Sequence, residues 1–320
     1  MKLGFAVKVL GQPGLKSNDT RRWQNNPHLS VSLAYLRDIF VYLRQIDVHM
    51  YRMSSDLAPY VTHPDMPQFH RQIEECAGEL AVVGEMARQD GLRLSFHPAA
   101  YVVLNAPDET TARKAMADLA AQAQMLERMG LGPEAVVVTH VGGIYGHKEA
   151  AMERFVARFH CLPEPARRRL VLENDERAYT LDDTYAIHRQ TGMRLILDQL
   201  HFLCNPVPGM TLPQAIALAL STWPADQTPK IHYSSPQTAM VVAERRDEAG
   251  QRQPTLRPPR LSQHADLIDP FPFIDLLRAA CPGRDFDVML ECKAKDLALL
   301  RLREHLNRLA PDLVEQYHIT

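Results

Sequence analysis

The sequence predicts an α/β fold, a single (β/α)8 TIM barrel, and three observations support that prediction. Short apolar runs rich in branched residues alternate with longer segments of helical periodicity, as in parallel strands covered by crossover helices. Eight such units follow one another along the chain. The 320 residues, 46% of them apolar, suit one barrel of about 250 residues with insertions. Residues 1–320 are therefore expected to form one domain.

The predicted elements can be given by residue number. The strands are 3–9, 49–53, 92–96, 135–139, 170–172, 195–197, 230–233 and 287–290. The helices lie near 31–46, 69–89, 109–129, 148–159, 180–191, 212–222, 273–280 and 295–309. The run NAPD at 105–108 can open the helix near 109–129, and Gly91, Gly130 and Gly192 stand where helices would end before the next strand.

The connection 234–260 differs from the others because it is long and polar. It contains four prolines and five arginines, Arg245, Arg246, Arg252, Arg257 and Arg260. Its length exceeds that of an ordinary loop, so it is either functional or disordered. We expect it to be inserted on the catalytic face, where its arginines could grip DNA phosphates. Glu244, Asp247 and Glu248 dilute that charge.

Composition says more about where the protein is expected to reside than about what it binds. The net charge is −2, from 36 basic and 38 acidic residues, so any nucleic-acid contact must come from a local basic surface. The five cysteines are widely spaced and form no C-x-x-C pair, which argues against a disulfide framework or a zinc ribbon. No signal peptide and no membrane-spanning segment is predicted. A cytoplasmic protein is expected.

Polar side chains follow nearly every predicted strand, at the end of the barrel where active sites form. His63 follows strand two, His97 strand three, His140 strand four, Glu173 strand five, Asp198 and His201 strand six, and Glu291 strand eight, while Lys230 and His232 lie within strand seven and His264 ends the connection after it. Any one of these histidines alone is more often exposed or hydrogen-bonded than a ligand. Together they predict a metal site, because apolar residues would serve a structural role at lower desolvation cost.

The number of candidate ligands indicates more than one ion. Imidazole and carboxylate groups are ligands of zinc and manganese, and nine of them exceed the roughly four to six that one ion uses. The sequence therefore predicts two or three divalent ions. Ions about 3.5–4 Å apart need bridging ligands, and Glu173 and Glu291 suit that role because each carboxylate has two oxygens. Such a site is suited to displacement at phosphorus.

Seven motifs along the chain resemble those of the UV damage endonucleases. They are RMSSDL at 52–57, LSFHP at 94–98, VTHVGG at 138–143, LENDE at 172–176, KIHYS at 230–234, HAD at 264–266 and MLECK at 289–293. The resemblance runs from about residue 3 to residue 309. Each motif is weak alone, but seven of them at the spacing of barrel strands are specific. A more distant similarity links the chain to endonuclease IV.

The resemblance implies a DNA repair endonuclease that nicks damaged double-stranded DNA on the 5′ side of a lesion and leaves a 3′-hydroxyl and a 5′-phosphate. It implies Mn²⁺ as the ion, with Zn²⁺ or Co²⁺ as alternatives, and no obligate protein partner. The metal ligands carried over are His63, His97, His140, Glu173, Asp198, His201, His232, His264 and Glu291. Glu173, Glu291 and a carboxylated Lys230 are the expected catalytic residues, and a lysine among divalent ions is electrostatically suited to losing its charge.

The lesion-reading segment departs from the family pattern. The family usually has a histidine-proline-x-glutamine-aromatic run whose glutamine and aromatic residue probe the damaged bases, whereas residues 97–101 read HPAAY. Tyr101 is retained and is expected to contact DNA, but Ala100 replaces the glutamine. Phe5 and Phe202 also stand where the family often has tyrosine and histidine. These departures affect the expected lesion preference more than the metal site.

Two alternatives stay open at this point. A xylose isomerase-like sugar isomerase or epimerase would also place histidines and carboxylates around divalent ions on such a barrel, although these enzymes usually need fewer ligands. A catalytically altered homologue that binds lesions without cutting is the other alternative. Intact Glu173 and Glu291 argue against it, and Ala100 argues mildly for altered recognition.

Overall fold

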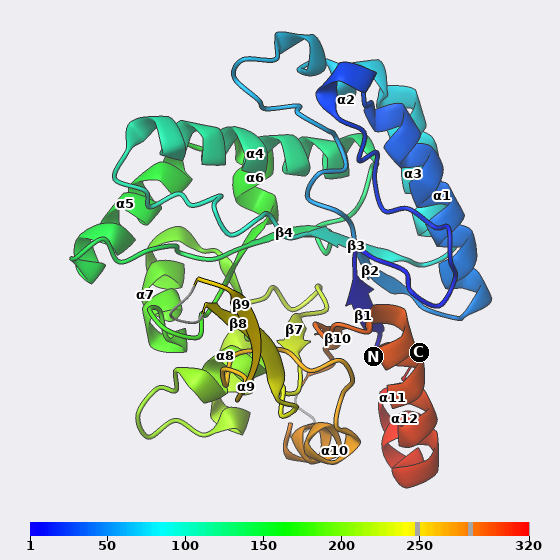
Figure 1. Cartoon of the computed structure of the whole chain (residues 1–320), viewed down its shortest axis with the longest axis vertical. Helices are drawn as coiled ribbons and strands as arrows, with labels where there is room; N and C mark the ends of the chain where they lie inside the picture. The colour runs from blue at the N-terminus through cyan, green and yellow to red at the C-terminus, as the bar shows by residue number, and fades with distance from the viewer. Residues whose placement is uncertain (247–249, 281–283, 320) are drawn as a thin grey trace.

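The computed structural model describes residues 1–246, 250–280 and 284–319, and its centre is a sheet of eight parallel strands (Figure 1). These strands are β1 (Leu3–Ala6), β2 (Met50–Arg52), β3 (Arg93–Phe96), β4 (Val136–Thr139), β5 (Leu170–Glu173), β6 (Arg194–Ile196), β7 (Lys230–Tyr233) and β10 (Asp287–Leu290). All eight correspond to predicted strands. The order in the sheet is β6-β5-β4-β3-β2-β1-β10-β7, which confirms the predicted barrel.

The barrel is nearly closed between its two end strands, β6 and β7. They meet through an isolated parallel bridge between Asp198 and His232. The backbone N–H of His232 also donates to the carbonyl oxygen of Leu197 at 2.9 Å. The closing contact therefore lies at the carboxyl ends of the strands, between two of the candidate ligands.

Helices connect the strands and cover the outside of the barrel. The main ones are α1 (Leu29–Gln45), α3 (Ala77–Gln89), α4 (Glu109–Arg128), α5 (Lys148–Cys161), α7 (Leu181–Thr191), α9 (Leu212–Ser221), α10 (Pro270–Ala279) and α11 (Lys295–Leu309). Short helices complete the connections: α2 (Gln72–Glu75), α6 (Glu164–Arg169), α8 (Gln199–Cys204), α12 (Pro311–Tyr317) and the 3-10 turns Trp23–Asn25 and Pro67–Phe69. Asp108 caps α4 by accepting from the Thr111 N–H, and Gly192 ends α7 with φ of 72°, as predicted.

Two predicted boundaries are wrong for local reasons. Strand β1 ends at Ala6, not at residue 9, because Val7 adopts φ of 65°, a left-handed conformation that interrupts an extended strand. Hydrogen bonds hold this turn, since the Val7 N–H donates to Arg52 O and the Tyr51 hydroxyl donates to Val7 O. The helix predicted near 69–89 is also divided, with α2 and α3 separated at Cys76.

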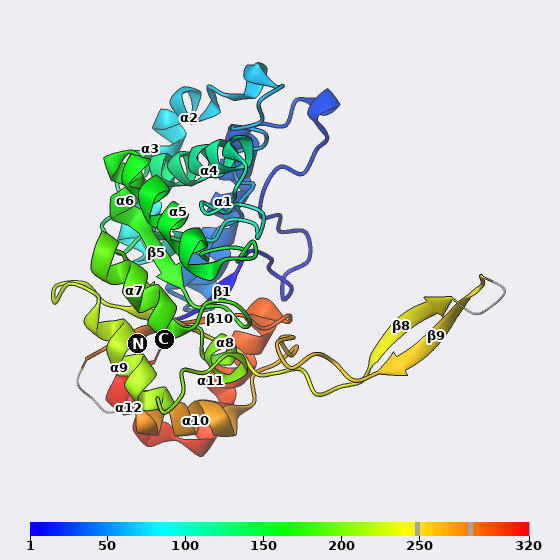
Figure 2. The ribbon, with the colours of Figure 1, turned by 90° about the vertical axis from the view of Figure 1, so that its left-hand side faces the viewer.

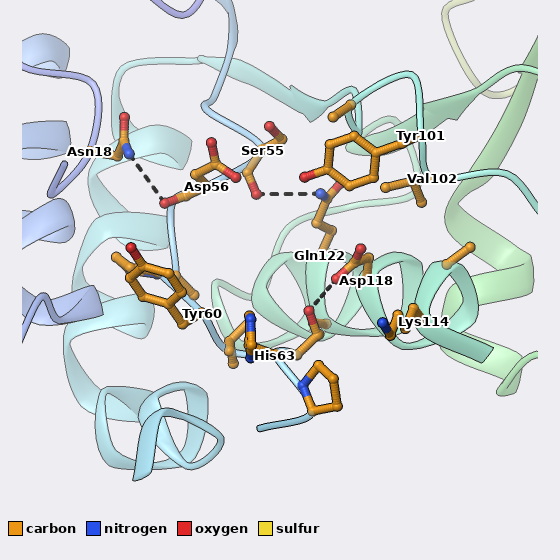
Figure 3. Close-up of a pocket in the computed structure, with 18 of the residues that line it drawn as sticks. Asn18, Ser55, Asp56, Tyr60, His63, Tyr101, Val102, Lys114, Asp118 and Gln122 are labelled. Atoms are coloured by element: carbon orange, nitrogen blue, oxygen red, sulfur yellow. Dashed lines mark hydrogen bonds between the residues drawn. The ribbon is translucent and has the colours of Figure 1, made fainter. Parts of the chain in front are cut away.

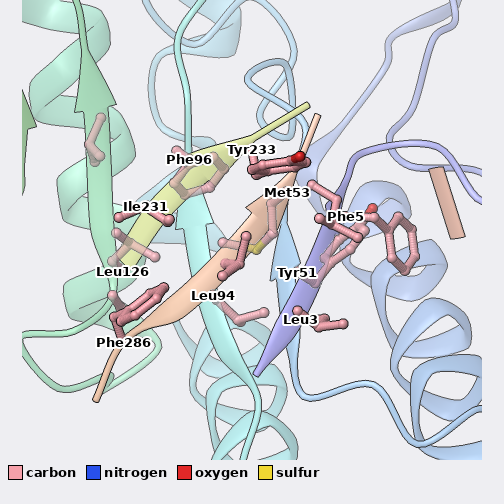
Figure 4. Close-up of a cluster of buried hydrophobic side chains, with 14 of the residues drawn as sticks. Leu3, Phe5, Tyr51, Met53, Leu94, Phe96, Leu126, Ile231, Tyr233 and Phe286 are labelled. Atoms are coloured by element: carbon pink, nitrogen blue, oxygen red, sulfur yellow. The ribbon is translucent and has the colours of Figure 1, made fainter. Parts of the chain in front are cut away.

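Alternate residues of each strand face the inside of the barrel. Val136, Val138, Val171, Ile196 and Trp223 form a buried cluster separate from the main core, which places these inward positions in the barrel interior. The outward positions pack against the helices in the large core, part of which is drawn in Figure 4, including Leu3, Phe5, Tyr51, Leu94, Phe96, Ile231 and Tyr233. The inward register at Glu173, His232 and Glu291 continues the interior positions toward the mouth.

The amino-terminal end of the barrel is filled by charged and aromatic side chains. Arg93 and Asp287 form an ion pair at 2.7 Å, and both are almost fully buried. The guanidinium groups of Arg93 and Arg194 lie 5.6 Å and 4.8 Å from the centre of the Trp223 ring. This end is packed, so the carboxyl end of the strands is where a substrate can approach.

The connection 234–260 carries an antiparallel hairpin of β8 (Val241–Arg246) and β9 (Arg252–Arg257), which the sequence analysis did not predict. Figure 2 shows this hairpin, here called the arm, reaching away from the barrel. It leaves after β7 and returns before His264, so it starts at the catalytic face. Arg252 and Arg257 on β9 are exposed. The side chains of Arg245 and Arg246, together with residues 247–249, lie outside the described residues.

The four cysteines in the described part of the chain, Cys76, Cys161, Cys204 and Cys292, are unpaired, in agreement with the sequence analysis; Cys281 lies outside it. Within the same residues, none of the helices has the length and apolar character needed to cross a membrane.

Candidate metal centre

Six of the candidate ligands gather at the carboxyl ends of the strands, inside the barrel mouth. They are His97, His140, Glu173, Asp198, His232 and Glu291. Each stands at an inward position of a strand or within two residues of its end, so strand geometry aims these side chains at the barrel axis. They form two groups of potential metal-binding atoms, and within each group the atoms lie within 4.8 Å of one another.

The first group consists of His97, His140 and Glu173. The Oε2 atom of Glu173 lies 3.1 Å from His97 Nε2 and 3.6 Å from His140 Nε2. The centroids of the two imidazole rings are 5.2 Å apart. Two imidazole nitrogens and one carboxylate oxygen facing one another can hold one divalent ion.

The second group consists of Glu173, Asp198, His232 and Glu291. His232 Nδ1 lies 2.8 Å from Glu173 Oε1 and 3.2 Å from Glu291 Oε1. Glu173 is therefore common to both groups, and each of its oxygens faces a different one. This arrangement is what a carboxylate bridging two ions requires.

His201 and His264 flank the second group. His201 Nδ1 lies 3.7 Å from Glu173 Oε1 and 3.8 Å from Asp198 Oδ1, and it also contacts the carbonyl oxygen of Asn174 at 3.0 Å. The ring of His264 is 6.3 Å from that of His201, and its Nδ1 contacts the carbonyl oxygen of Glu291. Both lie beside the centre without joining either close group of ligand atoms.

His63 lies apart from both groups. Its ring packs 6.2 Å from that of Tyr60, and its Nδ1 accepts a hydrogen bond from the Asp65 N–H at 3.3 Å. It lines a pocket of about 670 Å³ between the loop after β2 and helix α4, shown in Figure 3 with Tyr101 on its opposite side. His63 is therefore not part of either group of close ligand atoms, and its assignment as a ligand stays a prediction.

Tyr101 is 72% exposed on the loop after β3, and it borders the same pocket as His63. Three residues, Pro98 to Ala100, connect it to His97, so the exposed ring is on the same loop as a candidate ligand. An exposed aromatic side chain beside a catalytic cleft is available for stacking on a nucleic-acid base.

Burial and neighbouring charges shift several pKa values in the centre. Burial raises the pKa of Glu173, but His232 and His140 outweigh burial and hold it well below its ordinary value. Burial, reinforced by the charge of Glu173, raises the pKa of Asp198 to about 6. Burial lowers the pKa of His201, but Asp198 and Glu173 reverse the effect and raise it to about 9. The centre thus concentrates negative charge and retains protons that a divalent cation could displace.

Lys230 is fully buried within the barrel. It precedes His232 by two residues on β7, so both side chains face the interior. Burial, together with the charges of Arg52 and Arg93, lowers the pKa of Lys230 well below its ordinary value. Its Nζ has no hydrogen-bond partner among the described residues, so an ordinary ammonium ion would be poorly accommodated there.

The donor set fits a divalent cation. Asp198 Oδ2, Glu291 Oε1 and His140 Nδ1 are buried atoms without a hydrogen bond in the described part of the chain. Buried polar atoms without partners are costly, and oxygen and nitrogen donors of this kind are satisfied by metal coordination. Each of the two ligand groups therefore includes a residue with a buried atom that lacks a hydrogen bond.

Sequence reasoning missed two residues at this site. Asn174 is fully buried and links β5 to β6, because its Nδ2 donates to Asp198 O and its Oδ1 accepts from the Asp198 N–H. Arg52 is 7% exposed and contacts both Glu291 and His232. Both residues lie within the motifs already singled out. However, neither the hydrogen bonds of Asn174 nor the burial of the Arg52 charge produces a periodic pattern in the sequence.

The fold and the site together define a class: an α/β barrel of the TIM type with a carboxylate and histidine centre at its mouth, suited to divalent cations. The sequence model described as "UV-endonuclease UvdE" matches residues 28–315. The chain therefore belongs to the UV-endonuclease UvdE family.

Named relatives and a solved structure agree with this membership. A UV DNA damage endonuclease of Bacillus velezensis is 31% identical over 286 residues, covering 87% of this chain and 82% of the relative. One of Bacillus pumilus is 33% identical over 264 residues, covering 82% and 76%. The crystal structure of SacUVDE superposes with a TM-score of 0.77 at 26% identity, covering 97% of this chain and 99% of that chain.

Sugar epimerases share the fold. The crystal structure of a D-tagatose 3-epimerase-like protein matches with a TM-score of 0.58 at 12% identity over 99% of each chain. At this identity the likeness concerns the barrel and carries no information about the reaction.

Proposed function

We propose that this chain is a metal-dependent DNA repair endonuclease that hydrolyses the phosphodiester on the 5′ side of UV and other lesions. The observation that supports this most is that the two carboxylate oxygens of Glu173 face the other members of two different groups of potential ligands. A site for two neighbouring ions is suited to phosphodiester displacement. Membership of the UvdE family supports the choice of damaged DNA as the substrate.

The residues that would hold divalent ions are those of the two groups, with His201 and His264 at their margin. Such ions, when bound, activate water and neutralise charge on the phosphate and the departing oxygen. Two or three ions, with Mn²⁺ favoured, are part of the proposal. In the reaction, the oxygen of water bonds to phosphorus, the bond from phosphorus to O3′ breaks, and O3′ receives a proton.

The protein's own groups bind and orient the substrate. The exposed ring of Tyr101 is placed to stack at a distorted base step, where unstacking costs less than in intact duplex. Asn174 keeps Asp198 in place through two hydrogen bonds. Lys230 remains a proposed catalytic residue, and its burial among cationic groups favours a neutral amine or a carboxylated side chain.

Strand cleavage with Mn²⁺ tests the proposal. Purified protein is given three matched duplexes, carrying a cyclobutane dimer, an abasic site or no lesion. A nick 5′ to the dimer with 3′-hydroxyl and 5′-phosphate ends is the expected result, and it would also show that Ala100 permits lesion recognition. Cleavage at the abasic site alone would indicate a specificity like that of endonuclease IV.

The other outcomes separate the alternatives. Binding of the damaged duplex without cleavage would indicate a lesion-binding homologue, and neither binding nor cleavage would return the isomerase alternative. Glu173→Gln is the control for contaminating nucleases, because the amide keeps the shape of the side chain while replacing one carboxylate oxygen with an NH₂ donor.

A further inference from the structure

Arg52 is a buried cation inside the candidate metal centre. It is the last residue of β2 and is 7% exposed. Its Nη2 lies 2.5 Å from Glu291 Oε1 and 2.9 Å from His232 Nε2. The guanidinium group thus contacts two side chains of the second ligand group, although arginine itself binds no metal.

The guanidinium group also lies against the imidazole of His232. Its Nη2 is 2.9 Å from His232 Nε2 and 3.4 Å from His232 Nδ1, so it contacts the side of the ring that carries both nitrogens. His232 Nδ1 is in turn 2.8 Å from Glu173 Oε1 and 3.2 Å from Glu291 Oε1. A cation bound among these atoms would therefore meet the guanidinium group at close range.

The contact with Glu291 pairs opposite charges, but its geometry is not that of a hydrogen bond. Glu291 Oε1 has no hydrogen bond of normal geometry within the described residues, despite its closeness to the guanidinium group. A buried carboxylate of this kind retains lone pairs for a second positive partner. A divalent ion at the same oxygen would repel the guanidinium group, because both carry positive charge in a site with little water.

We propose that Arg52 competes with a divalent ion for Glu291 and His232, and that ion binding releases its guanidinium group to bind a phosphate oxyanion. The orphaned donor Nε of Arg52 supports the second half: it is buried and has no acceptor among the described residues. A planar fork of donors is suited to phosphate oxygens. Metal loading and phosphate binding would then be coupled through one side chain.

The competition is tested without DNA, by calorimetric titration of Mn²⁺ into metal-stripped protein. Arg52→Gln removes the competing charge, so the weaker of the bound Mn²⁺ ions is expected to bind about tenfold more tightly or better. Arg52→Lys keeps the charge and should show a smaller gain. Arg93→Gln is the matched control, since it also removes a buried interior arginine paired with a carboxylate, but at the other end of the barrel.

An Arg52→Gln protein that folds, as judged by circular dichroism, and binds Mn²⁺ no more tightly than the parent would overturn the competition. A measurement on the unaltered chain covers the case in which that variant does not fold. Titration with diamagnetic Zn²⁺ should shift the side-chain ¹⁵N resonance of Arg52 and leave that of Arg93 in place. An unmoved Arg52 signal at saturating Zn²⁺ would also overturn it.

Inorganic phosphate is the probe for the released guanidinium group. In the parent, phosphate should tighten Mn²⁺ binding, and Arg52→Gln should lose most of that gain; equal coupling in the two proteins would contradict phosphate binding by Arg52. This half rests on the proposed function, because it takes the anion to be a DNA phosphate. Neither titration measures nicking, so a failure of the cleavage assay and a failure of this inference are distinguishable.

Discussion

Glu173 stands at the junction of the two ligand groups and is almost completely buried. Its Oε2 faces the imidazoles of His97 and His140, and its Oε1 faces that of His232. A side chain with one acceptor oxygen could serve only one group. The chemistry of the centre therefore depends on both oxygens of this residue.

Glu173→Gln should lower the number of bound Mn²⁺ ions by at least one and reduce nicking by more than about 100-fold, the upper end of what losing a partner of a metal ligand costs. Metal content by mass spectrometry and single-turnover cleavage measure the two effects. Glutamine preserves volume, so the far-ultraviolet circular dichroism should be unchanged. Full metal content in a folded variant would contradict bridging by Glu173.

His63 and His140 provide a direct comparison between a histidine outside the ligand groups and one inside them. His140→Ala removes a nitrogen 3.6 Å from Glu173 Oε2 and should weaken metal binding by more than about tenfold. His63→Ala should leave the affinity unchanged, because its ring packs against Tyr60. Calorimetric titration of both variants with Mn²⁺ measures the difference. An equal loss in both would restore His63 as a ligand.

Asp118 gives a pH-dependent test in the pocket beside Tyr101. Burial, reinforced by the charge of Asp56, raises the pKa of Asp118 despite a hydrogen bond from Thr62. The carboxyl of Asp118 then binds its proton more tightly in the folded state than in the unfolded state. Its stabilising contribution is therefore fully present below the unfolded pKa, near 3.8, and is lost as the pH rises through the folded pKa.

Asp118→Asn should therefore raise the midpoint of thermal unfolding at pH 7, with the gain shrinking toward pH 4. Asparagine keeps an acceptor for Thr62, so the hydrogen bond is conserved. Differential scanning fluorimetry across this pH range measures the effect, and Asp65→Asn, an exposed residue at the same pocket, is the control. A gain that does not change with pH would point to a cause other than ionisation.

At the scale of elements, the arm of β8 and β9 is the feature most exposed to an extended substrate. A two-stranded ribbon can enter a DNA groove, and the arm starts at the catalytic face. Arg252 and Arg257 on β9 are exposed, and Arg252 forms an exposed ion pair with Glu244 at 2.9 Å. Exposed pairs of this kind contribute little to stability, so these arginines can be replaced without unfolding the arm.

Replacing both Arg252 and Arg257 with alanine should weaken binding of any duplex, damaged or not. The slope of log affinity against log salt should fall by roughly 2 if each arginine contacts one phosphate. Fluorescence anisotropy at several salt concentrations measures it. Leu256→Ser, an exposed uncharged position on the same strand, controls for shape. An unchanged slope in the double variant would exclude the arm from phosphate binding.

The arm also illustrates what sequence patterns could not predict at this scale. Alternation of apolar and polar residues identifies a strand when one face is buried, but Val242 and Leu256 pair with each other while both are largely exposed. With prolines on either side, the segment lacked the signature of a strand. The barrel strands were predictable because they are buried on both faces and are rich in branched apolar residues.

At the scale of the whole molecule, the gathering of the candidate ligands at one end of the barrel follows from topology alone. Once eight strand–helix units were assigned, parallel strands brought the residues after each strand to one mouth, and six candidates gather there. The sequence could not predict that His63 lies in neither close group of ligand atoms, since a residue several positions into a loop is no longer aimed by the strand before it. The contact of Arg52 with Glu291 likewise depends on side-chain conformation.

The barrel mouth also links metal binding to the stability of the entire fold. Glu173, Asp198 and Glu291 lie close together in a buried site, and Asp198 is also part of the bridge between the ends of the barrel sheet. A cation that binds the folded chain alone stabilises it by about 2.7 kcal/mol at one hundred times its dissociation constant. Chelation should therefore lower the midpoint of thermal unfolding by several degrees, and added Mn²⁺ should restore it.

Because Asp198 and His232 form the bridge that closes the barrel, hydrogen exchange in the chelated protein should increase first at β6 and β7. Uniform loss of protection, or no change in the midpoint, would show that the metal centre and the closure of the barrel are independent.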